Sequence, residues 1–272
     1  MENIRNFIQN VNLNTRLHDE HETFENVEAF RTHCLLGFEK LLALKDSCHG
    51  RPALVMGLGP SLLDLKKDKY SNHLKIVCND FHRVPGFFNE DFKPDYWCAA
   101  NNYATLKDPF ELCVKEGIGC FVTIPKKTEF EQFLKLSEGR QEHVLPWIWE
   151  HRVFQAMLAQ KYNIEAVYSH CNTVTNHMIA FALWLGCSQI EITGFDMSYR
   201  KAMAETGMTH AGFNYDSVSE DSSKLGSNAF DDAAERNQII NDLKYLCTLA
   251  HHTKVTIINH SHAANGLPEI LS

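Results

Sequence analysis

The sequence lacks the features that mark membrane, secreted and nucleic-acid-binding proteins. Its most apolar window, Ile179 to Leu185, is far shorter than the roughly 20 residues of a membrane-spanning helix. Residues 1–5 contain no apolar core of a signal peptide. The chain carries 26 Lys and Arg against 34 Asp and Glu, a formal charge of −8, whereas nucleic acids are bound by clustered cations. We expect no membrane span and no nucleic-acid partner, with peripheral contact to a membrane left open.

Disulfide bonds are not expected either. The nine cysteines are an odd number without a C-x-x-C pair, and several lie in or beside apolar runs, among them Cys78, Cys98, Cys120 and Cys171. A free cysteine in such a run acts as a small hydrophobic residue. The pattern favours reduced thiols and a cytoplasmic location.

Short apolar runs rich in β-branched residues recur along the chain, at residues 53–56, 74–78, 96–100, 120–124, 166–168, 190–194 and 254–258. Runs of this length are typical of buried parallel strands. Helical patterns lie between them: residues 173–185 are apolar on almost every side, and residues 229–250 are amphipathic. The alternation predicts an α/β fold with a doubly wound, mainly parallel sheet of the Rossmann-like type.

Two segments differ from the rest of the predicted catalytic domain, residues 51–272. Residues 1–50 are a helical N-terminal extension, amphipathic from Phe24 to Leu44, which either covers the sheet or joins two copies in a homo-oligomer. Residues 197–228 are rich in Gly, Ser and Asp and have no regular period. An insertion of this length is either a functional lid or a locally disordered loop.

A glycine turn, Gly57-Leu58-Gly59-Pro60-Ser61, follows the first apolar run and opens a predicted helix. Gly57 and Gly59 permit positive φ and a close approach of the backbone to a ligand, and Pro60 suits the first turn of a helix. Ser61 is able to donate to a phosphate oxygen, and the free amides of a helix start favour an anion. The motif is neither G-x-G-x-x-G nor a Walker A loop, so an ordinary tight turn is the alternative.

Polar residues end several of the predicted strands. Asn79 and Asp80 follow the second run, Asn101 follows the third, and Gly194 and Asp196 lie at the end of the sixth. Ligands of open α/β sheets bind at the carboxyl ends of the strands, and an Asn side chain both donates and accepts hydrogen bonds to a base or a ribose. Each Asn alone is commonly a turn or cap residue. Together with the glycine turn, these strand ends indicate a nucleotide site.

Taken in order, the short motifs of the chain resemble one superfamily. They are Gly57-Leu58-Gly59-Pro60-Ser61-Leu62, Val77-Cys78-Asn79, Lys93-Pro94-Asp95-Tyr96, Thr173-Val174-Thr175, Leu185-Gly186-Cys187-Ser188-Gln189-Ile190 and Thr193-Gly194-Phe195-Asp196. The superfamily joins the bacterial lipooligosaccharide sialyltransferases, which use CMP-sialic acid, to a second set. That set contains the motility-accessory-factor glycosyltransferases of flagellin and the archaeal 6-hydroxymethyl-dihydropterin pyrophosphokinases, and the Pro94-Asp95-Tyr96 segment is more similar to it.

The resemblance implies roles for particular residues. The glycine turn and Ser61 would contact the nucleotide phosphate, and Asn79 and Asn101 match asparagines that hold the cytidine nucleotide in the sialyltransferases. Thr173 matches the start of a buried helix near the donor, and Asp196 follows a glycine where ribose or metal contacts are expected.

The lid contributes two further residues by the same resemblance. His210 is the single histidine of residues 197–228 and corresponds to the catalytic lid histidine of the sialyltransferases. An imidazole suits a general base that takes the proton of an acceptor hydroxyl; an exposed loop histidine is the alternative. Tyr199 stands one residue later than the family tyrosine, and Leu58 replaces the family's Asn between the two glycines.

Three functions follow as hypotheses. The first is a glycosyltransferase that moves a sugar, such as sialic acid or another nonulosonic acid, from a CMP-linked donor to a glycan or protein acceptor, with no obligatory metal. The second is a pyrophosphokinase acting on a pterin alcohol, which would need Mg²⁺ held by Asp80 and Asp196. The third is a nucleotide-binding protein without catalysis.

Overall fold

A computed structural model describes residues 27–99, 103–123, 144–147, 151–163, 173–196 and 233–261, together with the single positions 6, 135, 136, 138, 140, 208, 211 and 212. The strands are β1 (Pro52–Met56), β2 (Leu74–Cys78), β3 (Tyr96–Ala99), β4 (Gly119–Thr123), β5 (Val144–Trp147), β6 (Gln189–Thr193) and β7 (Thr256–Asn259). The α-helices are α2 (Val27–Leu44), α3 (Tyr103–Glu116), α5 (His151–Tyr162), α6 (Val174–Trp184) and α8 (Ala233–His252). Short 3₁₀ helices join the early strands: η2 (Pro60–Asp64), η3 (Lys67–Tyr70), η4 (Phe81–Arg83) and η5 (Glu90–Phe92).

The strands form one seven-stranded sheet in the order β5-β4-β3-β2-β1-β6-β7. Every pair of neighbouring strands is parallel. The chain builds outward from β1 to β5 on one side and then returns to place β6 and β7 on the other. The predicted doubly wound parallel sheet is therefore confirmed, and its direction of winding reverses between β1 and β6.

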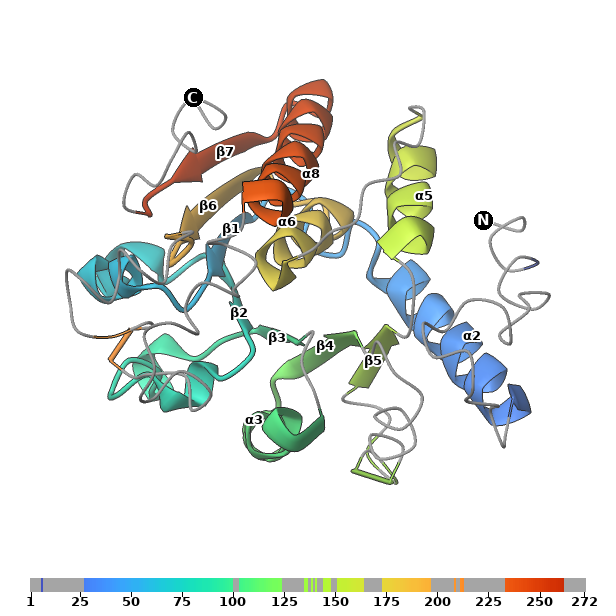
Figure 1. Cartoon of the computed structure of the whole chain (residues 1–272), viewed down its shortest axis with the longest axis horizontal. Helices are drawn as coiled ribbons and strands as arrows, with labels where there is room; N and C mark the ends of the chain where they lie inside the picture. Colours follow the sequence, from blue (N-terminus) through green and yellow to red (C-terminus); the bar gives the residue numbers. More distant parts are fainter. Residues whose placement is uncertain are drawn as a thin grey trace.

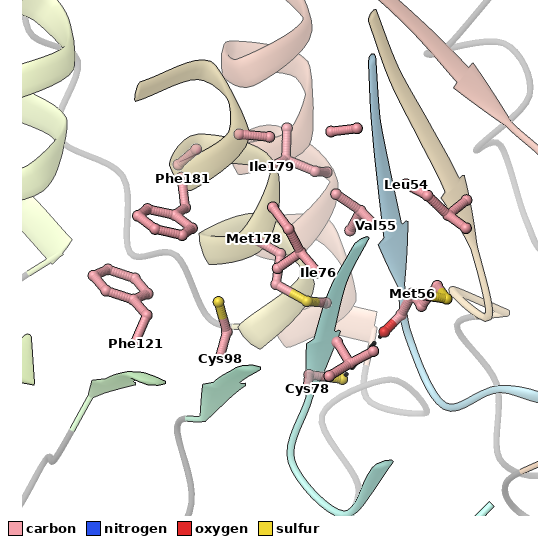
Figure 2. Packing of buried hydrophobic residues seen from close by; sticks show 14 of the residues in the cluster. Leu54, Val55, Met56, Ile76, Cys78, Cys98, Phe121, Met178, Ile179 and Phe181 are labelled. Carbon is pink, nitrogen blue, oxygen red and sulfur yellow. Dashed lines mark hydrogen bonds between the residues drawn. The ribbon is translucent and has the colours of Figure 1, made fainter. Parts of the chain in front are cut away.

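Helix α6 forms the centre of the layer on one face of the sheet. It packs on β1, β2 and β3 and also contacts α8, while α3 lies on the opposite face beside β4 and η4 (Figure 1). Figure 2 shows Val55, Ile76 and Cys98 pointing from the strands toward α6. On α6, the ring of Phe181 stacks on that of Phe121, with centroids 4.7 Å apart and planes 5° apart. Since α6 is covered on all sides, its sequence is apolar almost all round, as predicted for residues 173–185.

Helix α2 contacts β5, the strand at one edge of the sheet. Its Phe38 and Leu41 are buried in the common core, and the indole of Trp184 donates from Nε1 to the carbonyl oxygen of Leu41 at 2.6 Å. The described part of the N-terminal extension thus packs on the sheet domain, which agrees with the first of its two predicted roles. A role in joining two copies stays a prediction.

The structure differs from the predicted elements at three places. Strand β5 was not predicted, because Pro146 interrupts its short pattern; it lies at the edge of the sheet, where proline is tolerated. The last strand begins at Thr256 rather than at residue 254, since Lys254 is in a left-handed turn with φ 60°. The glycine turn opens the 3₁₀ helix η2 and not an α-helix. The predicted strand at residues 166–168 lies outside the described residues.

No disulfide joins the cysteines whose side chains the structure describes. Cys48, Cys78, Cys98, Cys113, Cys120, Cys187 and Cys247 are free thiols. No helix in the described part of the chain combines the length and the apolar character that crossing a membrane requires.

Candidate nucleotide site

The glycine turn lies where the winding of the sheet reverses, which is the usual place for a ligand in an open α/β sheet. It leaves the carboxyl end of β1 and immediately meets the carboxyl end of β6. The amide of Gly57 donates to the carbonyl of Thr193, and the amide of Gly59 donates to that of Gly194, each at 2.8 Å. The turn and the end of β6 therefore form one continuous hydrogen-bonded unit at this edge.

Close approach of two backbones explains the glycines of this unit. A Cβ atom on Gly57 would lie closer than 3.0 Å to the carbonyl of Gly194, and a Cβ on Gly194 would be equally close to the carbonyl of Gly57. Gly194 also has φ +70°, whereas Gly57 and Gly59 are not in the positive-φ region. Positive φ therefore does not explain Gly57 and Gly59. Atoms of Gly194 and Asp196, just after β6, leave no room for a Cβ at either position.

Asp196 places its carboxylate on the amide of the turn. The amide of Ser61 donates to Asp196 Oδ2 at 2.9 Å, and this oxygen lies so close to Gly59 that a side chain there would collide with it. The amides that open a helix favour an anion, and here a carboxylate of the chain itself lies at that position. A phosphate at the Ser61 amide would have to displace Asp196.

The side chain of Ser61 also contacts the end of β6. Its hydroxyl accepts a hydrogen bond from the amide of Gly194 at 3.0 Å, and its carbonyl accepts one from the hydroxyl of Thr193 at 3.3 Å. Ser61 is only 2% exposed. The structure thus places Ser61, Gly194 and Asp196 together, as expected for one site, and the contact of Ser61 with a phosphate stays a prediction.

Asn79 and Asp80 lie at the carboxyl end of β2, the neighbour of β1. Asn79 adopts a left-handed conformation with φ 41°, a geometry that Asn tolerates better than most residues. Its amide donates to the carbonyl of Cys98 at 3.0 Å, and its carbonyl accepts from Nε1 of Trp97 at 2.8 Å. These backbone contacts fix the position of Asn79 at the edge of the sheet. Asp80 is buried and immediately precedes η4.

His82, in η4, is a residue that the sequence analysis missed. It is half-buried, and its Nδ1 atom is buried without a hydrogen-bond partner in the described structure. Burial lowers the pKa of His82, and the charges of Asp80 and Asp108 oppose that effect only in part. The imidazole is therefore neutral at neutral pH. In the sequence, only the position of His82 two residues after Asp80 pointed to it as a site residue.

Thr173 lies at the start of α6 and caps this helix. Its side chain accepts a hydrogen bond from the amide of Asn176 at 3.2 Å, and Thr173 itself is buried. Because α6 leads into β6 and runs antiparallel to it, the N-terminus of α6 lies at the carboxyl edge of the sheet. The positive end of this helix favours an anion at that edge.

Two described lid residues contact the walls of the site. The amide of Ala211 donates to the carbonyl of Leu58 in the glycine turn at 2.7 Å, and Ala211 is fully buried. Gly212 has φ +80°, and a Cβ on it would lie 2.7 Å from Cδ of Pro85 in the connection between β2 and β3. The predicted site residues Asn101, Tyr199 and His210 lie outside the described residues.

In the described segments, no group of three or more His, Cys, Asp and Glu side chains has an arrangement that could hold a metal ion. Asp80 and Asp196, the proposed Mg²⁺ ligands of the second hypothesis, follow β2 and β6, which flank β1.

Comparison with known proteins gives a likeness of fold. No family model matches the chain, and no curated protein matches it. Among solved structures, the chain is similar to the sialyltransferase CstII from Campylobacter jejuni in complex with the substrate analogue cytidine-5′-monophosphate, with 15% identity, a TM-score of 0.47, and coverage of 78% of this chain and 81% of that chain. It is also similar to CstII in complex with CMP-3FNeuAc, with 15% identity, a TM-score of 0.44, and coverage of 77% of this chain and 81% of that chain.

Proposed function

We propose that the protein is a glycosyltransferase that moves a sialic acid or another nonulosonic acid from a CMP-linked donor to a hydroxyl of a glycan or protein acceptor. The observation that carries this proposal is the unit formed by the glycine turn and the end of β6 at the reversal point of the sheet. It holds a carboxylate, Asp196, by the amide of Ser61 at 2.9 Å. A fixed carboxylate at this edge suits the hydroxyl groups of a ribose, which donate hydrogen bonds to it.

The donor would lie along the carboxyl edge, from β6 across β1 to β2. The ribose faces Asp196, and Asn79 contributes from the end of β2, where its backbone is fixed by Cys98 and Trp97. The charge of Asp196 disfavours a phosphate at the Ser61 amide. The single phosphate of a CMP-sugar would instead lie toward the capped start of α6 at Thr173, where the helix dipole favours it.

The proposed chemistry is transfer at the anomeric carbon. The acceptor hydroxyl oxygen forms a bond to that carbon, the bond from the carbon to the phosphate oxygen breaks, and CMP leaves with the electron pair. The acceptor proton passes to His210, the proposed general base. The amide of the next residue, Ala211, donates a hydrogen bond to the carbonyl of Leu58 in the glycine turn. This contact supports a role for this part of the lid at the donor site.

The test has a binding arm and a turnover arm. Thermal shifts are measured with CMP, CDP, UDP, GDP, ATP and GTP, each with Mg²⁺ and with a chelator. A ligand at about 100 times its dissociation constant stabilises by roughly 2.7 kcal/mol, which is visible as a higher melting temperature. Release of CMP from CMP-sialic acid is then compared for the wild type, His210→Ala and the control His252→Ala, an exposed histidine at the end of α8. We expect a shift with CMP in the chelator and loss of turnover in His210→Ala alone.

The other two hypotheses correspond to distinct outcomes. Asp80 and Asp196 both follow strands that flank β1, an arrangement that favours the pyrophosphokinase as second candidate. A shift seen only with ATP or GTP and Mg²⁺ would support that enzyme and contradict the CMP-linked donor. A CMP shift without turnover of any nucleotide-sugar would indicate a binding protein.

A further inference from the structure

A second group of polar side chains surrounds Glu191 in β6. Glu191 is in register with Leu54 of β1, whose side chain points away from α6 (Figure 2). His260 Nε2 lies 2.6 Å from Glu191 Oε2, and His73 Nε2 lies 3.0 Å from Oε1. Gln189 donates from Nε2 to Oε1 at 2.7 Å. A single carboxylate therefore contacts one residue just before β2 and one just after β7.

The carboxylate of Glu191 is ionised in this arrangement. Its burial alone raises its pKa, but the hydrogen bonds from His260, His73 and Gln189 outweigh that effect and lower the pKa below 4.5. An ionised carboxylate only accepts hydrogen bonds. Both imidazoles must therefore donate from Nε2, and His260 is held with that proton directed at Glu191.

Tyr70, Arg51 and Lys75 also lie around this group. Tyr70 meets the rings of His73 and His260 edge-on, with centroids 4.9 and 6.3 Å apart. Burial raises the pKa of its phenol, and the charge of Glu191 and a hydrogen bond to that carboxylate raise it further. The cations Arg51 and Lys75 donate to the backbone carbonyl of His73, at 2.9 and 3.5 Å.

The His260 side of this group leads directly to the candidate nucleotide site. The amide of His260 donates to the carbonyl of Ile192 at 2.7 Å, which continues the pairing of β7 with β6. The next residue, Ser261, accepts at Oγ from the amide of Phe195 at 2.8 Å. Its own amide donates to Oδ1 of Asn259 at 3.0 Å. Phe195 lies between Gly194 and Asp196. The segment 194–196 is therefore hydrogen-bonded both to Ser261 after β7 and to Ser61 of the glycine turn.

We infer that Glu191 and His260 are a positioning pair for the nucleotide site: they fix Ser261 against the amide of Phe195 and thereby hold Asp196 toward the ligand. The ligand part of this inference rests on the proposed function. The ionised carboxylate of Glu191 accepts a hydrogen bond from His260 and so fixes that side chain. Ser261, the next residue, contacts the end of β6 through the amide of Phe195. His73 is bound to the same carboxylate but lies before β2, at the far end of the strands.

This difference between the two histidines makes a matched control. His73→Ala and His260→Ala each remove one hydrogen bond to Glu191, and both variants are expected to lower the melting temperature. Only His260→Ala should also weaken CMP binding, by up to about tenfold, the value of the one ligand hydrogen bond that a displaced Asp196 would lose. Ser261→Ala should act like His260→Ala. His260→Gln, whose amide is able to donate to Glu191, and Ser261→Thr, which keeps the hydroxyl, should recover most of the affinity.

Amide hydrogen exchange at Phe195 supplies a readout that does not depend on the ligand. Exchange at this amide should accelerate in His260→Ala and Ser261→Ala and stay at the wild-type rate in His73→Ala. Unchanged exchange at Phe195 in His260→Ala overturns the inference, as does equal loss of CMP affinity in the two histidine variants. If the exchange responds as expected but the wild type does not bind CMP, the positioning of Phe195 stands and the proposed donor is wrong.

Discussion

Replacement of Gly57 by alanine tests the close contact between the glycine turn and β6. The new methyl group would lie closer than 3.0 Å to the carbonyl oxygen and carbon of Gly194, which are backbone atoms and cannot rotate away. Overpacking of this kind costs about 1–3 kcal/mol. Opening one of the two backbone hydrogen bonds between the segments costs about 1 kcal/mol more, while the lower entropy of the unfolded alanine chain returns about 0.4–1 kcal/mol.

The expected net loss is about 1 to 3.6 kcal/mol of unfolding free energy, which lowers the melting temperature by about 2 to 14 °C. Gly86→Ala is the control. Gly86 has φ +60° and nothing within 4 Å of its Cβ position. Its replacement adds only the roughly 1–2 kcal/mol of a left-handed alanine, of which the unfolded-chain entropy returns about 0.4–1 kcal/mol. Both variants are unfolded with urea and by heat. If Gly57→Ala melts no lower than Gly86→Ala, the contact with β6 is not what requires a glycine at this position.

Three further predictions concern the site and its supports. Asp196→Asn should weaken CMP binding about tenfold, the value of one hydrogen bond; tighter binding would instead mean that the carboxylate competes with the phosphate for the Ser61 amide. Thr173→Ala should lower the free energy of unfolding by about 1 kcal/mol because the helix cap is lost, whereas Thr173→Ser should keep the cap. Equal melting temperatures for these two variants would contradict the role of Thr173 as a cap. Because the pKa of Glu191 is lowered on folding, its contribution is present above pH 4.5 and is lost as the pH falls through the folded value. Urea denaturation from pH 7 to pH 3 should show a steeper acid loss in the wild type than in Glu191→Gln.

The central strands could be predicted because their sequences report burial on both faces. Residues 74–78 form β2 as expected. The apolar runs that predicted β1, β3, β4 and β6 differ from the observed strands by no more than one residue at either end. A parallel strand with helices or turns on both faces requires an almost continuous apolar run. Strand β5 lies at the edge, includes Pro146 and is free of that requirement, so its local pattern resembles a loop.

The site was predictable as a set of strand ends but not as a set of contacts. The sequence places Ser61 and Asp196 each after an apolar run, and the parallel sheet brings those ends to one edge. The hydrogen bond between them joins residues 135 positions apart, and no local pattern encodes such a pairing. The group around Glu191 was missed for the same reason, because His73, Glu191 and His260 come from distant segments and each alone resembles an ordinary surface residue.

The pairing of β1 with β6 has a consequence for folding during synthesis on the ribosome. Strand β1 is complete long before its partner exists, since the bond from Ser61 to Asp196 spans 135 positions. At about 5 to 20 residues per second, synthesis leaves one edge of β1 unpaired for roughly 7 to 27 seconds. During that time Leu54, Val55 and Met56, all buried in the finished fold, form an open strand edge of the kind that other chains pair with. The glycine turn cannot close until β6 arrives, so a truncated chain that ends before β6 would expose this edge permanently and should aggregate.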